Sequence, residues 1–264
     1  MGHIRVGRLP KTRGWRQVIA LLDSSDSSSS EVAAATAKAA KDFFSQKRSD
    51  PALVFSYWIL TQITSRAKNE NYLKEIKKMG LDISSSKDAF DFLGRITTFT
   101  RRQIKLRGET FPISELAQLS LREVLTETIG QQSQTLFGTT QEDIILACRK
   151  YSTPNQFAKL ARLYFAKVLN RALQFFISKE SPNRIGLDRK FEDISDLSNF
   201  NLALEAYCYQ SAKIVEKFAG GWYSKRNWQG EISENDAKGF VSVAIEKLRA
   251  EIAREELAEQ AING

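Results

Sequence analysis

The feature that most constrains the fold of this chain is a long apolar stripe near its middle. Apolar residues recur there every three or four positions, at Phe157, Leu160, Ala161, Tyr164, Phe165, Val168, Leu169, Ala172, Leu173 and Phe176. This spacing matches the 3.6-residue period of an α-helix and not the two-residue period of a strand. We therefore predict a long amphipathic helix that must bury this stripe against other elements.

The same period recurs between Phe200 and Phe218 and between Phe240 and Ile252. Helix-start signals, in which a hydroxyl or carboxylate precedes Pro, Glu, Gln or Asp, stand in front of several segments. They are Asp50-Pro51, Ser85–Asp88, Thr139–Asp143, Thr153-Pro154 and Ser233–Asp236. No comparable segment with the two-residue period of a strand stands out. The sequence predicts an all-α globular bundle of eight to ten helices, with essentially no sheet and with a basic N-terminal arm.

The chain divides unevenly. Residues 1–23 are predicted to form the basic arm and a short amphipathic helix, whose apolar face carries Trp15, Val18 and Leu22. The low-complexity segment 24–31, rich in Ser and Asp, is predicted to be a linker. Residues 32–260 are predicted to form one helical domain, with a subdivision near 108–112 as the alternative. Whether the first helix docks on its own chain or on a partner is left open by the sequence.

The sequence lacks the residues that most enzyme mechanisms need. His3 is the single histidine, and Cys148 and Cys208 are the two cysteines, so imidazole catalysis and a thiolate zinc site are excluded. No Gly-rich phosphate loop is present. Acidic pairs such as Asp82 with Asp88 fall at predicted caps and turns. We expect no enzyme activity, no cofactor and no metal, with a carboxylate–metal enzyme as the least favoured alternative.

Two isolated cysteines do not make a disulfide framework, which favours a reducing cytoplasm. The longest apolar run, Ala52–Leu60, is too short to cross a bilayer, so we expect no membrane association.

Charge points toward an acidic partner. The 264 residues include 39 basic and 31 acidic side chains, which gives a net charge of +8. One basic cluster without any acid lies in the N-terminal arm, at Arg5, Arg8, Lys11, Arg13 and Arg16, and another at Arg101, Arg102, Lys105 and Arg107. Both are predicted to contact nucleic acid or a protein partner. The basic residues beside the apolar stripe, Lys159, Arg162, Lys167 and Arg171, are predicted to be the solvated side of the long helix.

The third candidate segment reads WYSKRNW. Gly220-Gly221 predicts a helix end and Ser233 the next helix start, which leaves an aromatic loop between them. Three interpretations stay open: the aromatic residues pack back on the bundle, anchor a protein interface, or stack on bases. The candidate binding residues here are Trp222, Tyr223, Lys225, Arg226 and Trp228.

Together these features predict a non-catalytic helical subunit of a larger intracellular assembly. Its basic arm and faces would contact nucleic acid or a nucleic-acid-handling protein, and other protein subunits are the expected partners. An accessory component of a bacterial mobile-element or antiviral-defence system is one setting for such a protein. The alternative is a pure protein–protein adaptor whose charge is incidental. The sequence predicts neither the oligomeric state nor the identity of the partner.

Overall fold

The computed structural model of the protein describes residues 9, 11–134, 138–187 and 189–263, with side chains described up to residue 254. The described residues form twelve α-helices and no strand, apart from one isolated bridge between Ile185 and Phe191. The helices are α1 Arg13–Asp23, α2 Ser29–Ala39, α3 Lys41–Lys47, α4 Pro51–Ser65, α5 Tyr72–Lys78, α6 Ala89–Arg107, α7 Ile113–Leu125, α8 Gln141–Lys150, α9 Pro154–Ile177, α10 Ile194–Ser211, α11 Lys213–Gln229 and α12 Glu234–Asn263.

The all-α prediction is confirmed, whereas the predicted count of eight to ten helices is too low. Two of the helices, α3 and α5, have only seven residues each. Two turns are too short for an apolar period to be recognised in the sequence. Short additional helical turns follow α4, α7 and α9, at Arg66–Lys68, Thr126–Gly130 and Ser181–Arg184.

Several helix starts follow from their caps. The Asp50 carboxylate accepts a hydrogen bond from the backbone N–H of Ala52 at 2.9 Å, and Pro51 occupies the first position of α4. Thr140 and Asp143 form a reciprocal capping box at α8. The start predicted at Ser85–Asp88 is wrong by about three residues. Asp88 itself is the cap of α6, because its carboxylate accepts from the N–H of Asp91.

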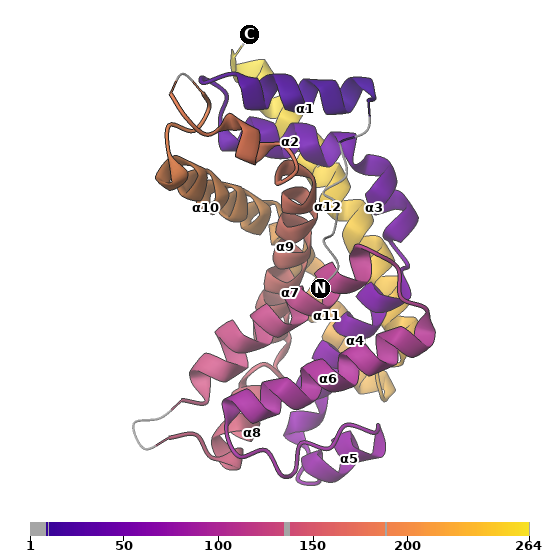
Figure 1. The fold of residues 1–264 in the computed structure, drawn as a ribbon. Coiled ribbons are helices and arrows are strands. Elements are labelled where there is room, and N and C mark those ends of the chain that lie inside the picture. The colour runs from indigo at the N-terminus through magenta and orange to yellow at the C-terminus, as the bar shows by residue number, and fades with distance from the viewer. Residues whose placement is uncertain (1–8, 10, 135–137, 188, 264) are drawn as a thin grey trace.

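Helix α9 is the centre of the packing. It runs vertically through the middle of the molecule in Figure 1 and contacts α2, α7, α10 and α11. The apolar stripe predicted for it is buried along its whole length, from Phe157 to Phe176. Next to it, Tyr57 of α4 stacks on Phe240 of α12 with ring centroids 4.8 Å apart. The core is therefore assembled from helices that are far apart in the sequence.

The N-terminal helix docks on its own chain, which answers the question that the sequence left open. Trp15, Val18 and Leu22 are buried, and the Trp15 ring lies 4.7 Å from that of Phe176 at the end of α9. The predicted linker 24–31 is wrong in its second half, because α2 begins at Ser29. Ser28 caps α2 through a capping box with Glu31. The first residues of the predicted basic arm, 1–8, lie outside the described residues.

Among the residues that the structure describes, no helix combines the length and the hydropathy needed to cross a lipid bilayer.

Candidate binding surface on helix α6

Helix α6 has one buried face and one basic face. Phe92, Ile96 and Ile104 point into the core, and the helix packs on α4 and α7. The opposite side carries three exposed cations, Arg101, Arg102 and Lys105. Residues four positions apart share a helix face, so these three side chains lie together. None of them forms an ion pair with a described residue. We call them the α6 cations.

Exposed apolar side chains lie beside the α6 cations. Leu106 is 72% exposed and Phe111 is 59% exposed. A groove with a volume of about 550 Å³ lies between the end of α6 and α7, and Arg101 and Phe111 contribute to its lining. Glu109 and Glu115 also line it, so the groove has mixed charge, unlike the outer face of the helix. The continuous basic surface is therefore the outer face of α6.

Arg107, which the sequence grouped with the α6 cations, is engaged inside the protein. Its Nε and one terminal nitrogen donate to the two carboxylate oxygens of Glu234, each at 3.0 Å. Its guanidinium carbon lies 4.1 Å from the centre of the Phe55 ring. These contacts join the end of α6 to the start of α12 and to α4. Arg107 is therefore left out of the candidate surface.

The basic residues of the N-terminal region lie elsewhere. Lys11, Arg13 and Arg16 are exposed at the start of α1. Helix α1 packs on α2 at the top of the molecule in Figure 1, whereas α6 lies in its lower half. Arg5 and Arg8 lie outside the described residues. The structure thus presents two separate basic surfaces and does not bring the predicted clusters together.

The predicted aromatic loop is wrong. Helix α11 continues through Gly220 and Gly221 to Gln229, and the chain turns at Gly230, whose φ is 134°. Gly220 has a packing role instead. A Cβ at this position would lie 3.0 Å from the carbonyl oxygen of Pro154, at the start of α9. The glycine allows α11 to approach α9 closely. From the sequence alone, a glycine that permits close helix packing cannot be distinguished from one that ends a helix.

Two of the three aromatic residues of this segment belong to the core. The Tyr223 ring stacks on Phe157 with centroids 3.8 Å apart, and its hydroxyl donates to Thr64 Oγ1 at 3.2 Å. Burial raises the pKa of Tyr223 to about 12. The Trp222 ring lies 4.5 Å from that of Phe240. The interpretation that the aromatic residues pack on the bundle therefore holds for Trp222 and Tyr223.

Trp228 differs from its neighbours because 88% of its surface is exposed. Lys225, three residues earlier on α11, is also exposed. Arg226 is partly withdrawn into the fold, since its guanidinium lies 3.2 Å from a carboxylate oxygen of Asp236. Trp228 and Lys225 are the residues of the segment that remain accessible to a partner.

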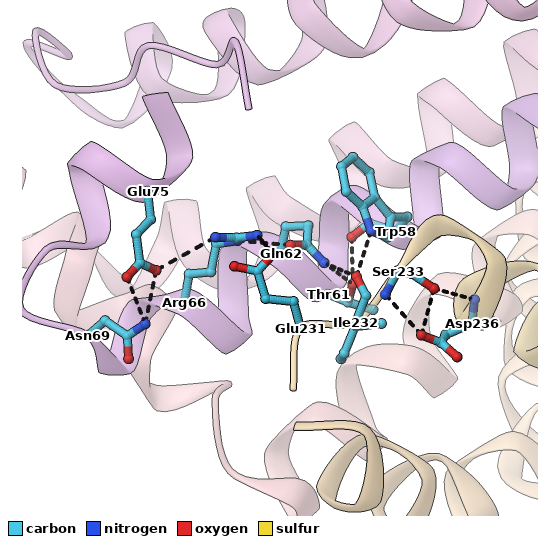
Figure 2. Close-up of polar contacts among 10 residues, drawn as sticks. All are labelled: Trp58, Thr61, Gln62, Arg66, Asn69, Glu75, Glu231, Ile232, Ser233 and Asp236. Atoms are coloured by element: carbon cyan, nitrogen blue, oxygen red, sulfur yellow. Dashed lines mark hydrogen bonds and ion pairs between the residues drawn. The ribbon is translucent and has the colours of Figure 1, made fainter. Parts of the chain in front are cut away.

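The connection after α11 is anchored on α4, as Figure 2 shows. The carbonyl oxygen of Ile232 accepts from both Trp58 Nε1 and Gln62 Nε2, each at 2.9 Å. Arg66 donates to Gln62 and pairs with Glu231 at 2.9 Å, and it lies 3.7 Å from Glu75. Buried polar groups of this kind are costly to leave without partners. We conclude that this network holds the turn in place and is structural.

The prediction that the polar side of α9 is solvated is correct for Lys159, which is exposed, and wrong for Lys167 and for the partly buried Arg162 and Arg171. Lys167 is only 5% exposed, and its ammonium lies within 2.8 Å of Glu123 and Glu127 and 2.5 Å of Glu205. Arg171 pairs with Glu123 as well. Burial opposes the charge of Lys167, but the carboxylates outweigh that effect and raise its pKa.

Arg162 shows the same behaviour one and a half turns earlier. It binds Glu216 at 2.9 Å and lies 3.8 Å from the centre of the Tyr209 ring. The polar side of α9 is therefore a seam of ion pairs to α7, α10 and α11. Glu123 and Glu127 are four residues apart, so they share one helix face, and this spacing was the available sequence signal for the ion pairs. However, the sequence does not show that this face meets α9.

Among the described residues, the cysteines and carboxylates do not form a recognisable reactive site. Cys148 and Cys208 are buried and form no disulfide, and burial raises the pKa of Cys148 to about 12. Asp82 accepts from Ser84 and pairs with Lys77, while Asp88 and Asp193 cap helices. In the described part of the chain, no group of three His, Cys, Asp or Glu side chains is arranged to hold a metal ion.

The α6 cations are suited to binding an anion. Arginine and lysine donate charge-assisted hydrogen bonds to phosphate and carboxylate oxygens, and neighbouring exposed apolar groups add contact area. Comparison with known proteins gave no match among protein-family models, curated protein sequences or solved structures.

Proposed function

We propose that this protein is a non-catalytic binding subunit of a larger intracellular assembly, and that the α6 cations contact the phosphate backbone of a nucleic acid. The observation that carries the proposal is a difference between cations. Arg107, Arg162, Lys167 and Arg171 all have carboxylate partners within the fold, whereas Arg101, Arg102 and Lys105 have none among the described residues.

Two further features support this assignment. Phosphate contacts require exposed cations on a rigid support, and α6 is held by its buried face against α4 and α7. Lys11, just before α1, and Arg13 and Arg16 in its first turns provide a second exposed basic surface. A long polyanion can contact two separated basic surfaces, whereas a small anion cannot.

The test measures the fluorescence anisotropy of labelled single- and double-stranded DNA and RNA between about 50 and 200 mM salt. The variant Arg101→Glu/Arg102→Glu/Lys105→Glu removes the α6 cations. The matched control Lys213→Glu/Lys217→Glu/Lys238→Glu makes the same change in net charge at exposed positions of α11 and α12.

We expect the α6 variant to weaken binding by at least about tenfold and to reduce the slope of log K against log salt by about 2–3, because each lost phosphate contact removes about one unit. The control should keep the wild-type slope. Equal loss in both variants, or no binding by the wild type at low salt, would refute the proposal.

Trp228 favours a second candidate, a protein–protein adaptor. A tryptophan that is 88% exposed is unusual on a free surface, and Trp is enriched among interface anchors. Affinity purification from the native host with and without nuclease separates the two candidates. A protein complex that survives nuclease and is lost in Trp228→Ala, but kept in the α6 variant, would favour the adaptor.

A further inference from the structure

A second feature of the molecule is a small apolar cavity between α2, α3, α9 and α12. Its volume is about 160 Å³. The walls are aromatic and aliphatic side chains that are almost completely buried, namely Phe44, Phe165, Val168, Leu169, Ile245 and Leu248. Phe165 is fixed by ring contacts with Tyr57 and Tyr164. The cavity is therefore a defined space with packed walls.

Cations from two sides of the cavity complete its lining. Lys38 and Lys41 come from the α2–α3 region and Arg249 comes from α12. Lys41 and Arg249 form no ion pair with any described residue. The glutamates on either side of Arg249 in α12 are engaged elsewhere, Glu246 with Arg48 and Glu251 with Arg254. Asp42, next to Lys41, is exposed. Lys41 and Arg249 thus bring to the lining positive charge that no described residue neutralises.

We propose that this cavity binds a small amphiphilic anion, with its apolar part between α9 and α12 and its carboxylate at Lys41 and Arg249. An apolar cavity of similar volume in another protein stays dry and accepts a six-carbon aromatic ring, so this one fits a group of about six to eight carbons. The guanidinium of Arg249 can hold both oxygens of a carboxylate. The combination of apolar walls with Lys41 and Arg249, which have no carboxylate partner among the described residues, is what selects an amphiphilic anion over a neutral apolar molecule.

Binding is measured by isothermal titration calorimetry of the full chain with butanoate, hexanoate, octanoate and 1-octanol. We expect affinity to rise by about threefold to fourfold for each methylene that enters the cavity. The rise should stop near eight carbons. We expect 1-octanol to bind at least about fivefold more weakly than octanoate, because it cannot pair with the cations.

Two variants test the two halves of the site. Lys41→Glu/Arg249→Glu reverses the charge of the lining, and we expect it to weaken octanoate binding by about tenfold or more. The control Lys213→Glu/Lys217→Glu has the same net charge but changes exposed residues of α11, so it should bind like the wild type. Ala253→Phe places a ring at an exposed position that lines the cavity, and it should abolish binding.

Circular dichroism verifies that each variant is folded. Should Ala253→Phe fail to fold, the charge-reversal pair still decides the question, because the exposed Lys41 and the half-buried Arg249 form no ion pair with a described residue that the change would break. The proposal is overturned if octanoate gives no heat of binding at saturating concentration. Equal affinity for octanoate and 1-octanol, or equal binding by the charge-reversed and control variants, would overturn it as well.

Discussion

The polar sides of α9 and α6 are both rich in basic residues, but their surroundings in the fold are opposite. Both place several cations on a helix whose other face is apolar. On α9, Lys167 is nearly inaccessible and is surrounded by Glu123, Glu127 and Glu205. On α6, the cations Arg101, Arg102 and Lys105 face outward with no carboxylate partner among the described residues.

The difference comes from the neighbouring helices. Helix α9 is surrounded by α7, α10 and α11, each of which brings glutamates to its polar side. Among the described residues, helix α6 packs through its inner side on α4, α7 and the helical turn Thr126–Gly130. What packs against a basic helix face therefore decides whether its cations form ion pairs within the fold or stay accessible. Three predictions test this conclusion, in order of decreasing expected effect.

The largest effect is expected for Lys167→Met. Removing the ammonium leaves three converging carboxylates without their shared cation, and breaking a buried ion pair in this way is strongly destabilising. The glutamates are partly exposed, so we expect a loss of about 2–3 kcal/mol in the free energy of unfolding, measured by urea denaturation. Lys159→Met, at an exposed position of the same helix, should cost less than about 0.5 kcal/mol. Equal effects of the two changes would mean that the α9 seam does not stabilise the fold.

A smaller effect distinguishes the cations of α6 from one another. Arg107→Ala removes a two-point contact with Glu234 and the packing over Phe55, so we expect it to reduce the free energy of unfolding by about 1–2 kcal/mol. Arg101→Ala should change it by less than about 0.5 kcal/mol, because an exposed side chain without a partner contributes little. Urea unfolding of both variants provides the measurement. A large cost for Arg101→Ala would show that the α6 cations have a structural role and would weaken the proposed function.

The smallest effect extends the comparison to two adjacent glycines of α11. Alanine in place of Gly221, around which no atom lies within 4 Å of the added Cβ, should stabilise the protein by about 0.5–1 kcal/mol through its higher helix propensity. At Gly220 the same change places a Cβ 3.0 Å from the Pro154 carbonyl oxygen, and we expect a net loss of about 1 kcal/mol. Thermal unfolding of both variants measures the difference. Stabilisation by both changes would show that α11 and α9 separate without cost.

Much of the local structure could be predicted from the sequence because its causes are local. Asp50 with Pro51 and Thr140 with Asp143 begin helices where the capping pattern predicts them. The stripe from Phe157 to Phe176 is buried, as its period requires. The wrong interpretations of Gly220, Arg107 and Lys167 have a common origin. Each residue was interpreted from its own segment, whereas its role comes from Pro154, Glu234 or Glu123 in another helix.

The sequence alone determined that this protein is all-α and where most of its long helices begin, because periodicity and capping act over a few residues along the chain. It also determined that the chain carries an excess of basic residues in a few clusters. Only the tertiary structure decided which of these residues remain accessible. Accessibility depends on burial, ion pairing and close helix packing, which involve residues on different helices, such as Lys167 and Glu205. Whether such residues meet depends on which helices pack together and not on the local sequence pattern.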